Sequence, residues 1–247
     1  MYKYKINSPF FNFESFILSI RNHFSENNNS IHKARNELKI ITHKNEALVV
    51  KSFKIPNFIR RVYYTFFRET KAKKSYDYSL KIGEFTPEPI AYIEFYNNAL
   101  LSDSYYIAKK FEYDFTIREP LIDADFEDKE KIFQEFAKFS YALHQKNIYH
   151  LDYSPGNILI KKEDDGFLFK IVDVNRMLFK TLSLDERLKN FSKLWAKNED
   201  LETIVKSYAQ LINNDEKICI DKALAYSQEH KYKKNIKKRL KGKKVVD

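Results

Sequence analysis

Hydrophobic and polar residues follow two different periods along the first half of this chain. From about Asn12 to Phe24 the apolar residues recur at helical spacing, which predicts an amphipathic helix. Its polar face holds few Lys or Arg, so we expect it to dock on the domain, with a membrane-surface helix as the alternative. The stretches Glu37–Ile41 and Ala47–Phe53 then read as two strands joined by a turn at His43–Glu46.

The pattern beyond these strands alternates between helix and strand. A helix is expected from Thr70 to Ile82, with Gly83 as its C-terminal cap. The segments Ile90–Phe95 and Ser104–Ala108 predict a strand pair around a polar turn at Leu101–Asp103.

The pattern becomes mainly helical after Pro120. Three amphipathic helices are expected, at Glu127–Gln145, Leu184–Trp195 and Leu201–Leu211. The pattern therefore predicts an α+β fold with a strand-rich N-terminal lobe and a mainly helical C-terminal lobe. The expected parts are a helical extension (residues 1–30), an N-lobe (31–109), a C-lobe (110–230) and a basic tail (231–247).

Composition narrows the class of protein. Hydrophobic residues make up 43% of the 247 positions and aromatic residues 16%, enough for a core in which rings pack on rings. A single cysteine, Cys219, excludes an intrachain disulfide framework. No apolar run approaches the roughly 20 residues that cross a bilayer, and no signal peptide is recognisable. We expect a cytoplasmic protein.

The net charge of +10 is unevenly distributed. Residues 231–244 contain nine Lys or Arg and no acid, which indicates a basic tail more than a basic fold. A second basic cluster, rich in aromatic residues, lies between residues 60 and 74. These residues could face an anionic substrate or membrane, or form a solvated helix surface.

The candidate chemistry is concentrated in residues 150–173. Asp152 and Asn157 are separated by a turn containing Pro155-Gly156, which can bring both side chains toward one point. An apolar strand, a turn and a second strand follow, and this hairpin is expected to return Asp173 beside Asn157. An acid that orients a hydroxyl, plus an Asn and an Asp that hold Mg²⁺, is the arrangement that kinase-type phosphoryl transfer requires. The alternative is an ordinary Asx-rich hairpin.

Two further residues extend this hypothesis. Lys51 ends an apolar strand, where the kinase template places the lysine that binds the nucleotide phosphates. Asp77, in the middle of the predicted 70–82 helix, is the candidate acid that pairs with Lys51; Glu69 and Glu84 are the rivals. His150 is expected to have a structural role, fixing the loop backbone, in preference to general-base catalysis.

At these residues the chain resembles the lipopolysaccharide core kinase family, a branch of the protein-kinase-like superfamily. The resemblance covers about residues 31–180. Its matching segments are Lys33–Lys39, Leu48–Phe53, Lys71–Tyr76, Thr86–Tyr92, Asp152–Leu159 and Val172–Met177.

The resemblance implies a bilobal protein-kinase-like fold, ATP and Mg²⁺ as cofactors, and phosphorylation of 3-deoxy-D-manno-octulosonic acid (Kdo) or heptose on lipid A. Asp152 and Lys51 would be catalytic, and Asn157 and Asp173 would bind the metal. Ser154 stands where protein Ser/Thr kinases usually carry Lys, which favours a small-molecule acceptor. The chain lacks a Gly-rich nucleotide loop, so Arg35 is the candidate for phosphate contact there. Basic residues would attract the protein to an anionic membrane surface.

Two alternatives remain at this point. A RIO-type atypical kinase shares a similar Asp152-to-Asn157 loop and would give the basic tail a role at ribosomal particles. A nucleic-acid-binding pseudokinase would use the tail alone, but Lys51, Asp152, Asn157 and Asp173 are all intact, which argues against it.

Overall fold

The structure is a computed structural model that describes residues 1–33, 36–53 and 57–242. The chain divides into two compact units. The first comprises Met1–Glu112 and the short segment Asp173–Asn175. The second comprises Tyr113–Val172 and the chain from Arg176 onward. Each unit is described by itself.

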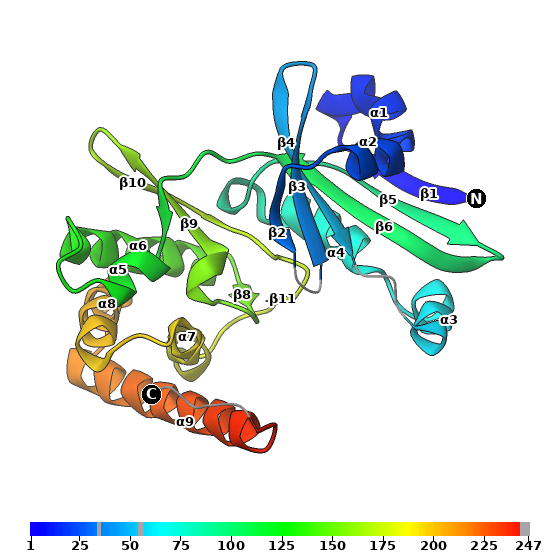
Figure 1. Cartoon of the computed structure of the whole chain (residues 1–247). Helices are drawn as coiled ribbons and strands as arrows, with labels where there is room; N and C mark the ends of the chain where they lie inside the picture. Colours follow the sequence, from blue (N-terminus) through cyan, green and yellow to red (C-terminus); the bar gives the residue numbers. More distant parts are fainter. Residues whose placement is uncertain (34–35, 54–56, 243–247) are drawn as a thin grey trace. The chain divides into compact units, whose positions relative to one another are not determined.

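The first unit is built on a six-stranded antiparallel sheet with the strand order β1-β5-β6-β4-β3-β2 (Figure 1). Its strands are β1 (Tyr2–Ile6), β2 (Ser30–Lys33), β3 (Asn36–His43), β4 (Glu46–Phe53), β5 (Pro89–Asn97) and β6 (Leu100–Lys109). Its helices are η1 (Ser8–Phe13), α1 (Glu14–Leu18), α2 (Ile20–Glu26), α3 (Phe58–Phe66), α4 (Lys71–Ile82) and η2 (Gly83–Phe85).

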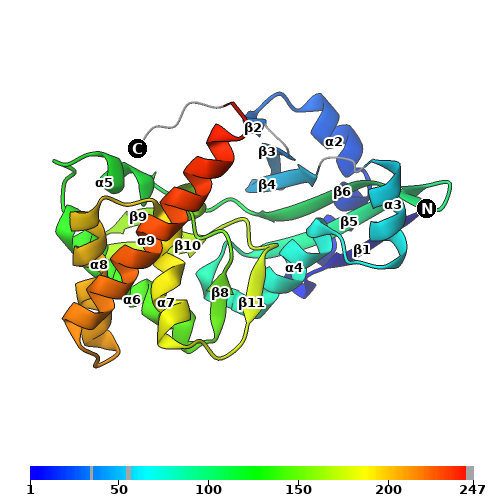
Figure 2. The same cartoon turned by 90° about the horizontal axis from the view of Figure 1, so that it is seen from below.

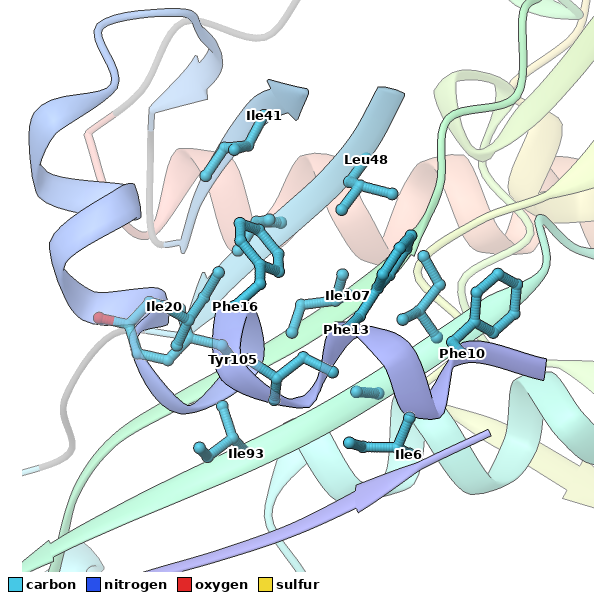
Figure 3. Close-up of a cluster of buried hydrophobic side chains, with 14 of the residues drawn as sticks. Ile6, Phe10, Phe13, Phe16, Ile20, Ile41, Leu48, Ile93, Tyr105 and Ile107 are labelled. Atoms are coloured by element: carbon cyan, nitrogen blue, oxygen red, sulfur yellow. The ribbon is translucent and has the colours of Figure 1, made fainter. Parts of the chain in front are cut away.

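One face of this sheet is covered by the N-terminal helices. Phe13, Phe16 and Ile20 from η1, α1 and α2 pack against sheet residues such as Val50 and Ile107 (Figure 3). The predicted helix over residues 12–24 therefore docks on the sheet as expected. It is interrupted at Ser19, whose hydroxyl bonds back to the Ser15 carbonyl at 2.7 Å.

The other face of the sheet packs against α4. Phe53 and Tyr92 from the sheet and Ala72 and Tyr76 from α4 form a second buried cluster. The predicted C-terminal cap of this helix is confirmed, since Gly83 is at that position with a φ of 57°. Because side chains alternate along a strand, Val50 and its neighbour Lys51 point to opposite faces.

The sequence pattern predicts the position of one of the two hairpin turns of this sheet correctly and misplaces the other. The predicted turn at His43–Glu46 is confirmed, with Lys44 and Asn45 both at positive φ. The turn predicted at Leu101–Asp103 is wrong, since the chain reverses at Asn98 and Ala99, also at positive φ. Ala99 is an unusual residue for such a turn, which is why the sequence pattern misplaced it.

The second unit is mainly helical and carries two small sheets. Its helices are α5 (Arg118–Ile122), α6 (Lys129–Gln145), η3 (Pro155–Asn157), α7 (Leu184–Phe191), η4 (Ser192–Leu194), α8 (Asn198–Leu211) and α9 (Glu216–Arg239). Its strands are β7 (Phe115–Thr116), β8 (Ile148–His150), β9 (Ile158–Glu163), β10 (Gly166–Ile171) and β11 (Met177–Phe179). The sheets have the orders β10-β9-β7 and β11-β8.

Helix α6 provides the centre of the second unit's core. Five residues of its predicted apolar stripe are buried, namely Ile132, Phe133, Phe136, Ser140 and Leu143, whereas the sixth, Phe139, is half-buried. Among the described residues, no helix combines the length and the apolar character needed to cross a membrane.

The C-terminal basic segment differs from its predicted form. Residues 231–247 were expected to be a tail, but α9 continues as a helix to Arg239 (Figure 2). The Lys231 ammonium donates to the Ala196 carbonyl at 2.7 Å, and the Lys238 ammonium lies 5.0 Å from the centre of the Trp195 ring. Contacts made by the helix therefore hold part of the basic segment in the unit.

Candidate active site

Lys51 lies on the α4 side of the first unit's sheet. In the strand register it pairs with Tyr106 of β6, which in turn pairs with Tyr92 of β5. Directly paired residues project from the same face of a sheet, so these three side chains form a row across three strands. Ser79 of α4 bonds to the Tyr106 hydroxyl at 2.7 Å, which shows that α4 covers this row.

The ammonium group of Lys51 forms an ion pair with Asp173. The distance from Nζ to Oδ1 is 2.7 Å, although the two residues are 122 positions apart in the sequence. The lysine side chain is only 12% exposed, and the aspartate 29%. Asp173 has a positive φ of 58°, a conformation that Asp tolerates, and the Asn175 amide donates to its carboxylate.

Asp77 and Arg35 are the other two residues of the first unit that the sequence predicts to bind the nucleotide. The Asp77 carboxylate accepts from Lys73 at 2.9 Å, and Lys73 also pairs with Glu69. The structure thus gives Asp77 a different partner from the predicted Lys51. Arg35 lies outside the described residues.

In the second unit, Asp152 and Asn157 are linked directly within the loop between β8 and β9. The side-chain nitrogen of Asn157 donates to the Asp152 carbonyl at 2.9 Å. Only the amide nitrogen can donate this bond, so the geometry identifies the other amide atom as the oxygen. Asn157 therefore presents a carbonyl oxygen, an atom type that Mg²⁺ prefers, away from the bond that fixes its side chain.

The hairpin that follows the loop is confirmed, with β9 and β10 paired from Glu163↔Gly166 to Ile158↔Ile171. Its far end is fastened by the Val172 amide, which donates to the Asn157 carbonyl at 2.9 Å. The residue that immediately precedes Asp173 is thus bonded to the backbone of Asn157.

His150 fixes the same loop from inside. It is 1% exposed, and its Nδ1 accepts from the Asp152 amide at 3.0 Å. Its Nε2 then donates to the Val172 carbonyl at 3.0 Å. Both bonds hold backbone on either side of the hairpin, in agreement with the predicted structural role of this histidine.

A buried polar network continues behind His150. Asn190 of α7 donates to the His150 carbonyl at 3.0 Å and accepts from His144 Nε2 at 3.2 Å. His144 Nδ1 accepts from the Tyr208 hydroxyl at 2.8 Å. Burial lowers the pKa of His144 to about 4, which keeps this ring neutral near pH 7. No local sequence pattern indicates these contacts, because they join α6, α7 and α8.

Several cations lie near the Asp152 loop in the second unit. Arg176 Nη1 is 3.7 Å from the Asp152 carboxylate, which is 41% exposed. The Arg118 guanidinium lies against Gly156, where an added Cβ would meet it at 2.6 Å. Burial, and after it the neighbouring Lys234 and Lys189, lowers the pKa of Lys193, whereas Asp152 acts in the opposite direction.

Sequence reasoning did not select these cations. Arg176 lies within the matching segment Val172–Met177, and this position was its only signal. Lys193 is brought close by the packing of α7, η4 and α9, which no spacing in the sequence reveals. The result is a positively charged surrounding for an exposed carboxylate.

Asp173 of the first unit and Asn157 of the second each offer oxygen atoms, the donor type that magnesium prefers to nitrogen or sulfur. Among the described residues, no three His, Cys, Asp or Glu side chains gather as a metal site. Mg²⁺ needs fewer protein ligands because it retains waters and binds substrate phosphates.

The antiparallel sheet with α4 on the face that carries Lys51, and the mainly helical second unit, define a protein-kinase-like fold. The chain is similar to a solved structure described as WaaP in complex with acyl carrier protein, with a TM-score of 0.58. The similarity covers 92% of this chain and 99% of that one, at 12% sequence identity.

At this identity the similarity shows a shared fold. In all, 1090 chains of solved structures match, so the fold is widespread and by itself does not select a substrate. No protein-family model matches the sequence. No curated protein matches it either.

Proposed function

We propose that this protein is an ATP- and Mg²⁺-dependent kinase that phosphorylates a hydroxyl of an anionic sugar. The observation that carries the proposal is the ion pair between Lys51 and Asp173. A strand lysine and an Asp that follows a hairpin are the two residues that a kinase uses at the phosphates and the metal. The fold shared with WaaP supports the same class of reaction.

Each residue has a role in this proposal. Lys51 would bind the nucleotide phosphates, and Asn157 and Asp173 would each offer oxygen atoms to Mg²⁺, whose charge would neutralise those phosphates. Asp152 orients the acceptor hydroxyl and takes its proton. The hydroxyl oxygen forms a bond to the γ-phosphorus while the bond to the β,γ-bridging oxygen breaks, and ADP leaves.

The proposed acceptor is the Kdo or heptose of the lipopolysaccharide inner core on lipid A. Two observations support an anionic acceptor: the Asp152 carboxylate is exposed, and Arg176 and Lys193 lie near it. A cation beside the general base would attract a carboxylate or phosphate on the sugar. The resemblance of residues 31–180 to the core kinase family selects Kdo, which carries a carboxylate, or a heptose attached to the anionic inner core.

The direct experiment is incubation with labelled ATP, Mg²⁺ and Kdo-lipid A, in parallel with a heptose-containing acceptor, ribosomal particles and general protein substrates. We expect label in the lipid-linked sugar, and its loss with Asp152→Asn. Asp164→Asn, an exposed acid in the β9–β10 turn, is the matched control and should keep activity. Transfer to ribosomes or protein alone would replace this proposal with the RIO-type alternative.

The basic C-terminal segment provides a weaker argument against the nucleic-acid alternative. Lys231 and Lys238 both make contacts within the second unit. RNA binding that survives Asp152→Asn, with no ATP turnover by the wild type, would support the pseudokinase.

Acyl carrier protein is a candidate partner. It is bound in the WaaP structure to which this chain is similar. Co-migration of the two purified proteins in gel filtration would establish the partnership, and separate elution would remove it.

A further inference from the structure

Helix α3 presents its apolar side to solvent. Five large hydrophobic side chains on it or at its end are exposed, by 46% to 77%. They are Phe58, Ile59, Tyr63, Phe66 and Phe67. Ile59, Tyr63, Phe66 and Phe67 follow the spacing i, i+4, i+7 and i+8, which places them on one face of a helix.

The polar side of the same helix is the side that attaches to the first unit. Arg61 Nε donates to the Leu101 carbonyl at 2.7 Å, and the Leu101 amide donates to the Thr65 hydroxyl at 3.0 Å. Helix α3 is thus fixed to β6, near the turn of the β5–β6 hairpin (Figure 2). Its orientation is the reverse of an ordinary surface helix, which buries its apolar face.

The charge around this face indicates what could cover it. The segment from Asn57 to Arg68 contains three arginines and no Asp or Glu. Aromatic rings flanked by arginines suit the boundary between lipid headgroups and acyl chains, where rings enter the apolar layer and cations stay with anionic headgroups.

We propose that the exposed face of α3 docks on an anionic lipid surface. Ile59, Phe66 and Phe67 enter the headgroup boundary, while Arg68 contacts lipid phosphates. This inference is independent of the proposed kinase activity, since it depends on the packing of α3 alone.

The test is sedimentation with vesicles of phosphatidylglycerol and phosphatidylethanolamine, compared with phosphatidylcholine vesicles. We expect the wild type to bind the anionic vesicles preferentially. The triple variant Ile59→Ser/Phe66→Ser/Phe67→Ser should lower the partition coefficient at least about tenfold, given the apolar area withdrawn from lipid. Arg68→Gln should lower it about fivefold on anionic vesicles and leave phosphatidylcholine binding unchanged.

Phe11→Ser is the matched control, because Phe11 is 64% exposed in the same unit but lies away from α3 in η1. It should bind vesicles like the wild type. Equal binding by the triple variant and the wild type would overturn the proposal. A wild-type dimer in sedimentation velocity that dissociates only in the triple variant would also overturn it. A second copy of the chain would then cover the exposed face of α3.

A second readout avoids the risk that the triple variant misfolds. An environment-sensitive dye attached to Phe67→Cys should shift its emission to the blue on anionic vesicles, whereas the dye on Phe11→Cys should not. The native Cys219 is buried and so less accessible to the label. No shift at position 67 would refute the proposal.

The vesicle tests and the kinase test fail separately. Phosphorylation of a detergent-free, soluble sugar acceptor should be the same for the triple variant and the wild type. Vesicle binding without phosphotransfer would leave the docking surface standing and refute the kinase proposal.

Discussion

Lys51 and Asp152 are held in place by different kinds of interaction. Lys51 projects from a strand, and its ammonium group is paired with the carboxylate of Asp173. Asp152 lies in a loop whose backbone is fixed by buried, neutral hydrogen bonds that start at His150. A phosphate can replace a carboxylate beside a lysine, whereas a buried neutral network has no exchangeable member.

The comparison suggests a division of tasks. In the proposed kinase, the ion pair of the first unit would open when a nucleotide brings phosphates and a cation. The loop of the second unit is preorganised, because a series of buried hydrogen bonds supports it. These bonds link His150 to Asn190, Asn190 to His144 and His144 to Tyr208. The predictions below separate these two arrangements by activity, by stability and by pH.

The largest expected effect is on catalysis. Lys51→Met and Asp152→Asn should each lower kcat/KM about 10³-fold, equivalent to roughly 4 kcal/mol of transition-state stabilisation. Nucleotide affinity should distinguish them, because only Lys51 is assigned to the phosphates. Titration with a fluorescent ATP analogue should show weaker binding for Lys51→Met alone. Equal affinity for both variants would contradict the division of tasks.

The second largest expected effect is on the free energy of unfolding, through the buried hydrogen-bond network that holds the Asp152 loop. Asn190→Leu keeps the side-chain size but removes the buried hydrogen bonds that Asn190 makes to the His150 carbonyl and His144 Nε2. We expect a loss of about 3 kcal/mol in the free energy of unfolding. Urea unfolding measures it, with the exposed Asn198→Leu as the control. A loss similar to that of the control would mean that the network does not hold the loop.

Features that depend on residues close together in the sequence could be predicted, whereas contacts between residues far apart in the sequence could not. The loop and its hairpin were predicted because turn residues and strand periods are local, and Asp152, Asn157 and Asp173 fall within 22 consecutive positions. The row of Lys51, Tyr106 and Tyr92 depends on strand register, which no local pattern specifies. The sequence therefore predicts Asp77 of α4 as the partner of Lys51, whereas the structure pairs Lys51 with Asp173.

The helices show the same limit. The apolar stripe of α6 was predicted from its 3.6-residue periodicity, and all of its predicted residues but the half-buried Phe139 are buried. In α3 the apolar face is exposed instead, since Arg61 and Thr65 attach the polar side to Leu101. Periodicity identifies a face, but only tertiary contacts decide whether it is buried.

Acid should act on the network of the second unit. The pKa of buried His144 is about 4 in the folded chain and near 6.5 when unfolded. The unfolded state therefore binds a proton first as the pH falls, and stability is lost from about pH 6.5 down to about pH 4. Between about pH 8 and pH 5 this residue should cost about 2 kcal/mol.

The measurement is urea unfolding at a series of pH values, with His144→Gln beside the wild type. The variant is less stable at neutral pH, but its stability should fall less steeply on acidification. His230, whose pKa is also lowered to about 4, contributes in both proteins and cancels in the difference. Parallel curves for the two proteins would exclude His144 as the acid-sensitive member of the network.

The smallest expected effect is the contribution of the Lys51–Asp173 ion pair to the free energy of unfolding. Lys51→Met removes one partner, but Asp173 is 29% exposed and still receives a bond from Asn175, so its charge is not stranded. The free energy of unfolding should change by less than about 1 kcal/mol, and a double-mutant cycle with Asp173→Asn should give a coupling of similar size. A coupling energy as large as the loss of stability in Asn190→Leu would show that the ion pair is needed to stabilise the fold. It would then be costly for a nucleotide to open, and the contrast between an exchangeable lysine and a preorganised loop would not hold.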